Sequence, residues 1–223
     1  MVITIDGPTA SGKSTIAARL AQQLGYYYLN SGYLYRGISY LLLTKYNYTI
    51  DQLINPIKEH VHEILDPSRF VYSYYNGIAY VSYDGVDITS FLKTKENDQA
   101  SSIVSANSMV RDATLDYQRH ITKNYSVVAE GRDTGTIVFP CAEVKFFLTA
   151  SPEIRAKRWQ QMQAQKGKDY SLEQAIKVLA ERDARDSERA IAPLIVPEGA
   201  YVLDSSNLSQ DQVIEAIIAR ISR

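Results

Sequence analysis

The stretch Ile3-Thr4-Ile5-Asp6-Gly7-Pro8-Thr9-Ala10-Ser11-Gly12-Lys13-Ser14-Thr15 decides the fold of this chain. Residues 7–14 fit G-x-x-x-x-G-K-[ST], the phosphate-binding P-loop, which requires a strand before it and a helix after it. Residues 2–5 form an apolar run that is typical of a buried strand. Apolar residues then recur at helical spacing from Ile16 to Leu24, and Gly25 suits a helix C-cap. The flanking sequence therefore favours a true P-loop over a glycine-rich turn between two packed elements.

A P-loop predicts a site for the phosphates of a nucleotide. Its glycines let successive backbone N–H groups point inward, and these groups form an anion nest at the positive end of a helix. Lys13 can reach the β- and γ-phosphates, and Ser14 can bind magnesium. The residues that we predict to bind ATP are Gly7, Pro8, Thr9, Ala10, Ser11, Gly12, Lys13, Ser14 and Thr15.

The composition is that of an ordinary soluble globular protein. The 223 residues, 45% hydrophobic and 22% charged, suffice for one large domain or for a domain with an insertion. A formal net charge of -1 does not indicate non-specific binding to nucleic acid or to a membrane. The single cysteine, Cys141, excludes an intrachain disulfide framework, and we expect it to be a small apolar packing residue. No signal peptide and no apolar run of membrane-spanning length are expected, so the predicted location is cytoplasmic.

Strand-like apolar runs alternate with helical patterns along the chain, which predicts an α/β fold with a parallel sheet. Ser151 followed by Pro152 is typical of a helix start. Two capping boxes, Ser171 with Gln174 and Ser209 with Gln212, predict two further helix starts. The predicted strands of the sheet are residues 2–5, 26–29, 126–129, 144–148 and 201–203.

Residues 66–92 break the alternating pattern. Two aromatic and β-branched runs, 69–75 and 78–83, flank Asn76-Gly77, a dipeptide typical of a type I′ hairpin turn. A second turn at Asp84-Gly85 predicts a small antiparallel meander inserted between α/β units. The many tyrosines here either cover this small sheet, which we favour, or bind nucleobases.

The three histidines do not indicate a metal site. His60 and His62 stand two residues apart on an expected helix, and His120 stands alone. This is not metal-ligand spacing, so we expect them on solvated helix faces.

The stretch Asn30-Ser31-Gly32-Tyr33-Leu34-Tyr35-Arg36 follows a predicted strand and opens a helix. Ser31 can cap that helix, and the capping role alone would explain it. Arg36 can bind a phosphate through two nitrogens, or it can be a solvated helix arginine.

Charged residues also follow the predicted strand at 126–129. The segment continues as Glu130-Gly131-Arg132-Asp133. Ligands of open α/β sheets bind outside the carboxyl ends of the strands, so these side chains are predicted to lie beside the P-loop. A charged turn after a strand would explain one such acid but is a weaker account of three charged residues around a glycine.

A second charged stretch, residues 181–189, is expected to be helical. Arg182, Asp186 and Arg189 would then share one face, with Arg185 on its flank. Mutual ion pairing on a solvated surface is the alternative. Beside a P-loop, however, arginines serve phosphoryl transfer, which depends mostly on positioning and on charge stabilisation. Arg155 and Arg158, on the preceding helix, are further candidates.

These motifs together resemble the bacterial cytidylate kinases, a family of nucleoside monophosphate kinases. Besides the P-loop, the matching motifs are Asn-Ser-Gly-x-x-Tyr-Arg at 30–36 and Gly-Arg-Asp-x-Gly-Thr at 131–136 with Val138-Phe139-Pro140. The last is Glu-Arg-Asp-x-Arg-Asp at 181–186, with Arg189 and Ala192-Pro193-Leu194. They run in family order from Ile3 to about residue 208. The combination is highly specific, whereas the P-loop alone is not.

The resemblance implies a Mg2+-dependent enzyme of pyrimidine nucleotide metabolism that transfers the γ-phosphoryl group of ATP to CMP or dCMP. It implies a three-layer P-loop kinase domain over 1–223, with a monophosphate-binding insert at about 60–100 and a helical lid at about 155–190. The expected partners are ATP and CMP or dCMP, without nucleic acid or membrane, and a monomer is expected. Carried over by motif, the catalytic residues are Lys13, Arg132, Arg182 and Arg185, and Ser14 binds the metal. The residues implied to bind CMP are Ser31, Arg36, Ser102, Arg111, Arg132, Asp133, Arg182, Asp186 and Arg189.

The chain departs from the family pattern at two positions. The family often has Asp where this chain has Asn30 and Glu130. The longer arm of Glu130 changes its reach, which puts a direct role in magnesium binding in doubt. Two other functions stay open: a P-loop kinase for a different small molecule, and a regulatory module that binds ATP without an acceptor.

Overall fold

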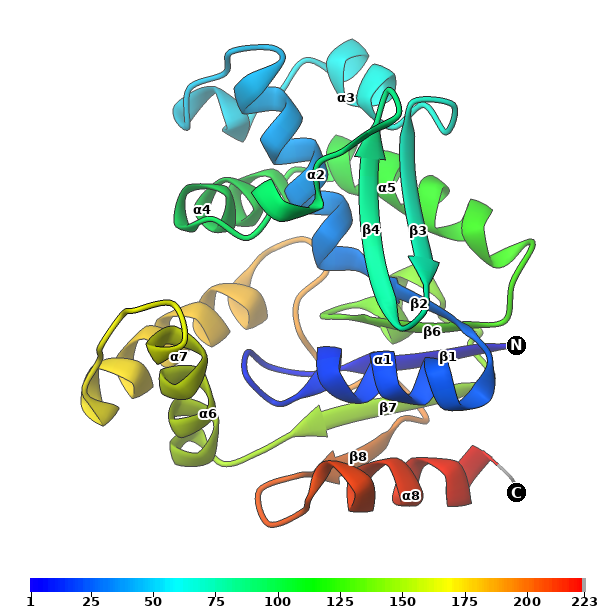
Figure 1. Ribbon diagram of the computed structural model, residues 1–223, viewed down its shortest axis with the longest axis vertical. Helices are drawn as coiled ribbons and strands as arrows, with labels where there is room; N and C mark the ends of the chain where they lie inside the picture. The colour runs from blue at the N-terminus through cyan, green and yellow to red at the C-terminus, as the bar shows by residue number, and fades with distance from the viewer. Residues whose placement is uncertain (222–223) are drawn as a thin grey trace. The chain divides into compact units, whose positions relative to one another are not determined.

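The structure is a computed structural model that describes residues 1–221 (Figure 1). It consists of two compact units. The first comprises Met1–Leu24 and Val128–Arg223, and the second is the intervening segment Gly25–Val127. No helix within residues 1–221 is long and apolar enough to cross a membrane.

A parallel β-sheet with the strand order β2-β6-β1-β7-β8 confirms the predicted fold class. Strand β1 pairs with β7 in the register Ile3↔Val144, and β7 pairs with β8 in the register Phe146↔Tyr201. The residues of β1 and β6 are almost all buried, which explains why apolar residues predominate in both strands instead of alternating with exposed polar ones. The strands are β1 (Val2–Asp6), β2 (Tyr27–Asn30), β6 (Val127–Gly131), β7 (Val144–Thr149) and β8 (Tyr201–Asp204).

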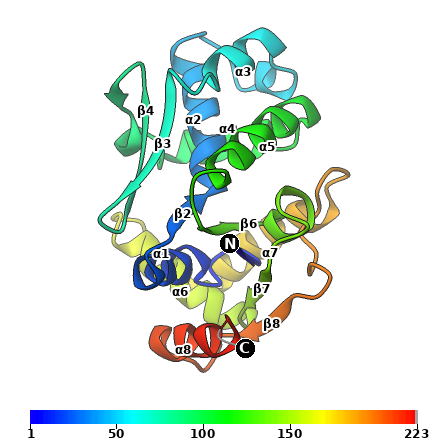
Figure 2. The same cartoon turned by 90° about the vertical axis from the view of Figure 1, so that its right-hand side faces the viewer.

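Helices of the first unit cover its strands and form a separate hairpin. Helices α1 and α8 lie on one side of β1, β7 and β8, and the short helix η3 lies on the other (Figure 2). The helices α6 and α7 pack against each other around Ala156, Ala175 and Leu179. The bounds are α1 (Lys13–Leu24), η3 (Thr134–Val138), α6 (Pro152–Ala164), α7 (Leu172–Glu188) and α8 (Gln210–Ile221).

The sequence signals for helix starts are confirmed in this unit. The Ser151 side chain accepts a hydrogen bond from Ile154 N at the start of α6. Ser171 and Gln174 form the reciprocal capping box of α7. These local bonds satisfy backbone N–H groups that have no partner inside the helix, so the signals do not depend on distant parts of the chain.

The second unit contains the predicted antiparallel meander, with the strand order β3-β4-β5. Positive φ angles at Asn76 (50°) and Gly77 (80°) confirm the hairpin turn, and Asp84 and Gly85 repeat this pattern in the next turn. The strands are β3 (Phe70–Tyr75), β4 (Ile78–Tyr83) and β5 (Val86–Asp87). The helices are α2 (Ser31–Thr44), η1 (Asp51–Ile54), α3 (Lys58–Ile64), η2 (Thr89–Phe91), α4 (Lys95–Val104) and α5 (Ser108–Thr122).

Tyrosines hold the meander to its neighbours in the second unit. The Tyr72 hydroxyl donates to Tyr28 O and accepts from Asn30 N, both at 3.0 Å. The Tyr117 hydroxyl donates to Phe70 O at 2.8 Å and accepts from Tyr72 N at 3.0 Å. Each ring adds apolar area while its hydroxyl satisfies backbone groups, so the packing role that we favoured for the tyrosines accounts for Tyr72.

Three smaller expectations are wrong. Asn30, not Ser31, is the N-cap of α2, and Ser31 is the first helical residue. Cys141 is exposed rather than packed in the interior, because it lies in the turn after η3. His60 is half-buried rather than solvated, since its ring stacks on Tyr46 with the ring centroids 4.1 Å apart.

Candidate active site

The P-loop joins β1 to α1 in the first unit and has the backbone geometry that its motif predicts. Gly7 has a φ of 149°, and a Cβ added there would lie 2.0 Å from Leu148 O. Only glycine fits this position, because the loop passes directly against β7. Gly12 (98°) and the non-glycine Ala10 (59°) also have positive φ angles. These positive φ angles give the loop the sharp turn on which an anion nest ahead of α1 depends.

Lys13 is buried in this nest, with 5% of the residue exposed. Its Nζ donates to Pro8 O at 2.7 Å and to Ser11 Oγ at 3.5 Å. Burial and, to a smaller extent, the nearby charge of Arg132 lower the pKa of Lys13 to about 7, while Glu130 opposes the change. A bound polyphosphate would favour the charged form of Lys13. The buried lysine therefore provides a positive charge for a phosphate group to bind.

Ser14 and Glu130 form a pair of hard oxygen donors beside the loop. The Ser14 hydroxyl donates to Glu130 Oε1 at 2.7 Å, and Glu130 lies buried near the end of β6. Hydroxyl and carboxylate oxygens are ligands that Mg2+ prefers, so this donor set fits the implied cation. The sequence predicted Ser14 for this role, and the structure adds the carboxylate that contacts it.

Asp6, which the sequence analysis did not single out, fixes the segment after β6. Its Oδ1 accepts from Thr134 N at 2.9 Å and from Thr134 Oγ1 at 2.7 Å, and its Oδ2 accepts from Gly135 N at 2.7 Å. Burial raises the pKa of Asp6, and these hydrogen bonds oppose the shift. Because both oxygens are engaged, Asp6 positions the 133–135 turn. Its place at the end of β1 was the only signal in the sequence.

Arg132 connects the turn after β6 to both helix α7 and the P-loop. Its Nε donates to Asp186 Oδ2 at 2.7 Å, and its Nη2 donates to Thr9 Oγ1 at 2.9 Å. Burial alone would raise the pKa of the Asp186 carboxyl, but Arg132, Arg182 and Arg189 keep it below its usual value. The structure thus brings together the predicted residues Arg132, Asp186 and Arg182.

The remaining predicted residues of the first unit lie in different surroundings. The helical face predicted for residues 182–189 is wrong at its end, because α7 stops at Glu188 and Arg189 has an extended backbone. Arg189 Nη2 instead lies 3.7 Å from Asp133 Oδ1 in an ion pair. Arg185 is exposed, and its Nε donates to Glu181 O of its own helix.

Two arginines of α6, Arg155 and Arg158, bind the P-loop backbone. The sequence analysis named them only as further candidates for phosphoryl transfer. Arg155 Nη1 donates to Thr9 O at 3.1 Å, and it also pairs with Asp183. Arg158 Nη1 donates to Ser11 O at 3.2 Å and to Ser205 Oγ at 3.0 Å. Asp183 was missed altogether, although it lies within the Glu-Arg-Asp-x-Arg-Asp motif.

The second unit carries the other predicted residues. Arg36 on α2 forms an ion pair with Asp98 of α4 at 2.9 Å. Arg111 on α5 is buried, donates to Ser105 O at 3.0 Å, and places its guanidinium 5.7 Å from the centre of the Tyr35 ring. Ser31 is buried at the start of α2, and Ser102 is exposed on α4.

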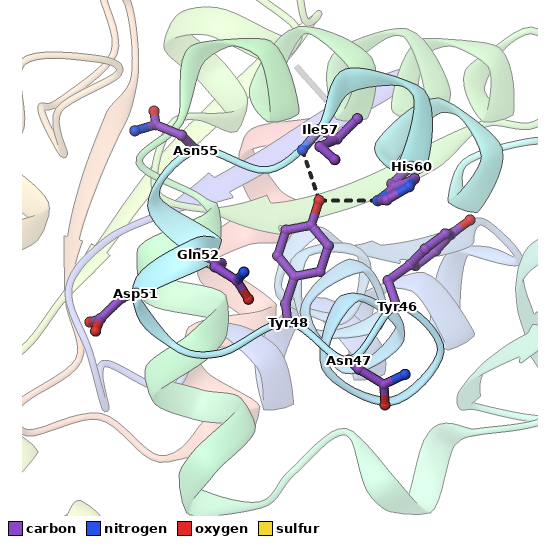
Figure 3. A pocket seen from close by; sticks show the side chains of 8 residues that line it. All are labelled: Tyr46, Asn47, Tyr48, Asp51, Gln52, Asn55, Ile57 and His60. Carbon is purple, nitrogen blue, oxygen red and sulfur yellow. Dashed lines mark hydrogen bonds between the residues drawn. The ribbon is translucent and has the colours of Figure 1, made fainter.

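A cavity of about 380 Å³ lies elsewhere in the second unit (Figure 3). Tyr48 is at its centre, and the hydroxyl of this residue accepts from Ile57 N and bonds His60 Nδ1, both at 3.0 Å. None of the predicted site residues lines it. The lining residues are Tyr46, Asn47, Tyr48, Asp51, Gln52, Asn55, Ile57 and His60.

Comparison with known proteins gives a consistent result over the whole chain. The family model for cytidylate kinase matches residues 3–223. A cytidylate kinase of Thermodesulfovibrio yellowstonii is 37% identical over 221 residues, which cover 99% of this chain and 97% of that protein. A cytidylate kinase of Paraburkholderia phymatum is 40% identical, with 97% of this chain and 91% of that protein covered.

A solved structure also shares the fold. An uncharacterized protein from Eubacterium ventriosum matches with a TM-score of 0.56, covering 100% of this chain and 98% of that chain. The sequence identity is 11%, so this likeness concerns the fold alone.

Proposed function

The chain belongs to the cytidylate kinase family, and we propose that it transfers the γ-phosphoryl group of ATP to CMP or dCMP, producing ADP and CDP or dCDP. The observation that carries this proposal is the family match across nearly the whole chain. The site in the first unit supports the proposal. It has a P-loop with the buried Lys13, the hydrogen-bonded pair of Ser14 and Glu130, and Arg132 close by.

We place the triphosphate of ATP in the P-loop, at residues 7–15. Backbone N–H groups of the loop and the Lys13 ammonium would neutralise the β- and γ-phosphates. Ser14 would bind Mg2+, with Glu130 orienting its hydroxyl. The cation supplies charge neutralisation on the transferring group.

The acceptor oxygen belongs to the CMP phosphate, which is already ionised near neutral pH, so the reaction needs no nucleophile from the protein. The difficulty is the repulsion between two anions, and preorganised cations reduce it. We assign this role to Lys13, Arg132, Arg182 and Arg185. Arg132 would exchange its bond to Asp186 for a phosphate oxygen, with Asp186 remaining beside the acceptor.

Recognition of the base would depend on Asp133. Cytosine has an amino donor at N4 where uracil has an acceptor at O4, and a carboxylate accepts from the first and repels the second. The residues proposed to contact the acceptor nucleotide are Ser31, Arg36, Ser102, Arg111, Arg132, Asp133, Arg182, Asp186 and Arg189.

Water must be excluded during transfer, because it would otherwise accept the phosphoryl group. We propose that the helices α6 and α7, within about 155–190, form a lid for this purpose, and that the meander belongs to a monophosphate-binding insert at about 60–100. In the cell the enzyme would act in the cytoplasm as a monomer in pyrimidine nucleotide metabolism, without a nucleic-acid partner.

A coupled assay for ADP with CMP, dCMP, UMP and AMP as acceptors tests this function. ADP production with CMP or dCMP, and little with UMP or AMP, is expected. Turnover only with another acceptor would indicate a different small-molecule kinase. Binding of ATP without any acceptor-dependent turnover would indicate a regulatory module.

A further inference from the structure

We propose that Asp183 of α7 and Arg155 of α6 are positioning residues that hold Thr9 of the P-loop in its phosphate-binding conformation. This inference rests on the proposed binding of ATP in that loop. Asp183 and Arg155 would not contact the substrate. They would link the α6–α7 hairpin to the loop that binds the donor nucleotide.

Every polar group of Thr9 is bonded to a charged side chain from outside the loop. Asp183 Oδ1 accepts from Thr9 N at 3.1 Å, and Arg155 Nη1 donates to Thr9 O at 3.1 Å. Arg132 Nη2 donates to Thr9 Oγ1 at 2.9 Å. The peptide units on both sides of Thr9 are therefore fixed by the two helices, and its side chain is fixed by the turn after β6.

Asp183 and Arg155 also bind each other, so the two anchors act together. Arg155 is 9% exposed, and its Nε donates at 3.1 Å to the carbonyl oxygen of Ala150, directly after β7. Hydrogen bonds that involve charged groups are about twice as strong as neutral ones, and a partly buried position strengthens them further. The anchor thus extends from the sheet through α6 and α7 to the loop.

The neighbouring residue explains why an anchor is needed. Ala10 adopts a φ of 59°, a left-handed conformation that is unfavourable for an L-residue with a Cβ. Ala10 packs against the apolar cluster of Ala156, Ala175 and Leu179 between α6 and α7. The hydrogen bonds to the Thr9 backbone and the apolar contacts of Ala10 come from the same two helices. The hairpin therefore holds a strained turn that the loop would not keep alone.

The consequence is specific to the donor nucleotide. Loss of the anchor should loosen the phosphate nest and weaken ATP binding, and it should leave CMP binding unchanged. Asp183→Ala removes the bonds of this side chain to Thr9 N and to Arg155. We expect it to raise the Kd for Mg2+-ATP at least about tenfold. Asp183→Asn keeps an oxygen for Thr9 N but loses the charge, so its Kd should lie between those of the wild type and Asp183→Ala.

The experiment measures the Kd for ATP and for CMP separately by calorimetry, with the thermal midpoint of each variant as a check on folding. Glu181→Ala removes an exposed carboxylate from the same helix and is the matched control, with both Kd values within twofold of the wild type. A lower midpoint with an unchanged Kd for ATP would overturn the proposal, because Asp183 would then only stabilise the fold. An equal rise in the Kd for CMP would overturn it as well.

Amide hydrogen exchange of the wild type gives a test that needs no variant. The Thr9 N–H should exchange slowly in the nucleotide-free protein, because Asp183 holds it. Exchange as fast as that of an unprotected amide would overturn the anchor, even if every Asp183 variant failed to fold. If the wild type bound no ATP, the proposed function would fail, while slow exchange at Thr9 would still support the anchor.

Discussion

The depressed pKa of Lys13 predicts that ATP binding takes up a proton. With a pKa of about 7 in the free protein, only ~10% of Lys13 is charged at pH 8, whereas the bound triphosphate should restore full protonation. Binding at pH 8 should therefore take up about 0.9 proton per ATP, against about 0.1 at pH 6. The cause is burial of the Lys13 ammonium beside Arg132, with no carboxylate among residues 1–221 bonded to it directly.

Calorimetry in two buffers with different ionisation enthalpies measures this uptake, with Mg2+ saturating so that ATP is fully complexed. Lys13→Arg is the matched control, since a guanidinium stays charged in proteins and has no proton to gain. It should show an uptake below about 0.2 at pH 8, which also measures any contribution from ATP itself. An uptake independent of pH, or equal in the wild type and in Lys13→Arg, would refute the reasoning.

Three further predictions concern turnover. Lys13→Ala should lower kcat more than tenfold, because a preorganised charge at the transferring group contributes about 3 kcal/mol; a folded variant that keeps more than ~10% of kcat contradicts this role. Arg182→Ala and Arg185→Ala should lower kcat more than they raise the KM for ATP, as measured by steady-state kinetics. An unchanged kcat in both variants would show that these arginines form only surface ion pairs. Asp133→Asn should narrow the ratio of kcat/KM for CMP over UMP, since an amide can donate as well as accept; an unchanged ratio would assign base recognition elsewhere.

Local signals in the sequence were sufficient for most of the fold. The turn at Asn76-Gly77 and the capping box at Ser171 depend on residues within three or four positions, so the sequence predicts them directly. The P-loop is also local, and its glycines have the positive φ angles that the motif requires. The burial of Cys141 and His60 was predicted wrongly, because Cys141 lies in an exposed turn and the ring of His60 stacks on Tyr46 of another segment.

The site was predicted less completely, for a physical reason that the segment 181–189 illustrates. Helical spacing assumes that the helix continues, but α7 ends at Glu188, so Arg189 turns to Asp133 instead of joining the face of Arg182. Helical periodicity also predicts which residues share a face of a helix, but not which residues that face contacts. It could not show that Asp183 contacts Thr9, which lies 174 positions away. Pairings of this kind follow from the packing of α6 and α7, which no local pattern specifies.

At position 130 the length of the side chain decides what the carboxylate can do. Glu130 is 5% exposed and bonds the Ser14 hydroxyl at 2.7 Å, so the longer arm is used to reach α1. An aspartate on the same backbone would be one methylene shorter and would leave this hydroxyl without the carboxylate. The charge of Glu130 also raises the pKa of Lys13 against the larger effect of burial. Glu130 therefore prepares two groups for the nucleotide: it orients the hydroxyl proposed to bind Mg2+, and it favours the charged form of the lysine proposed to bind the phosphates.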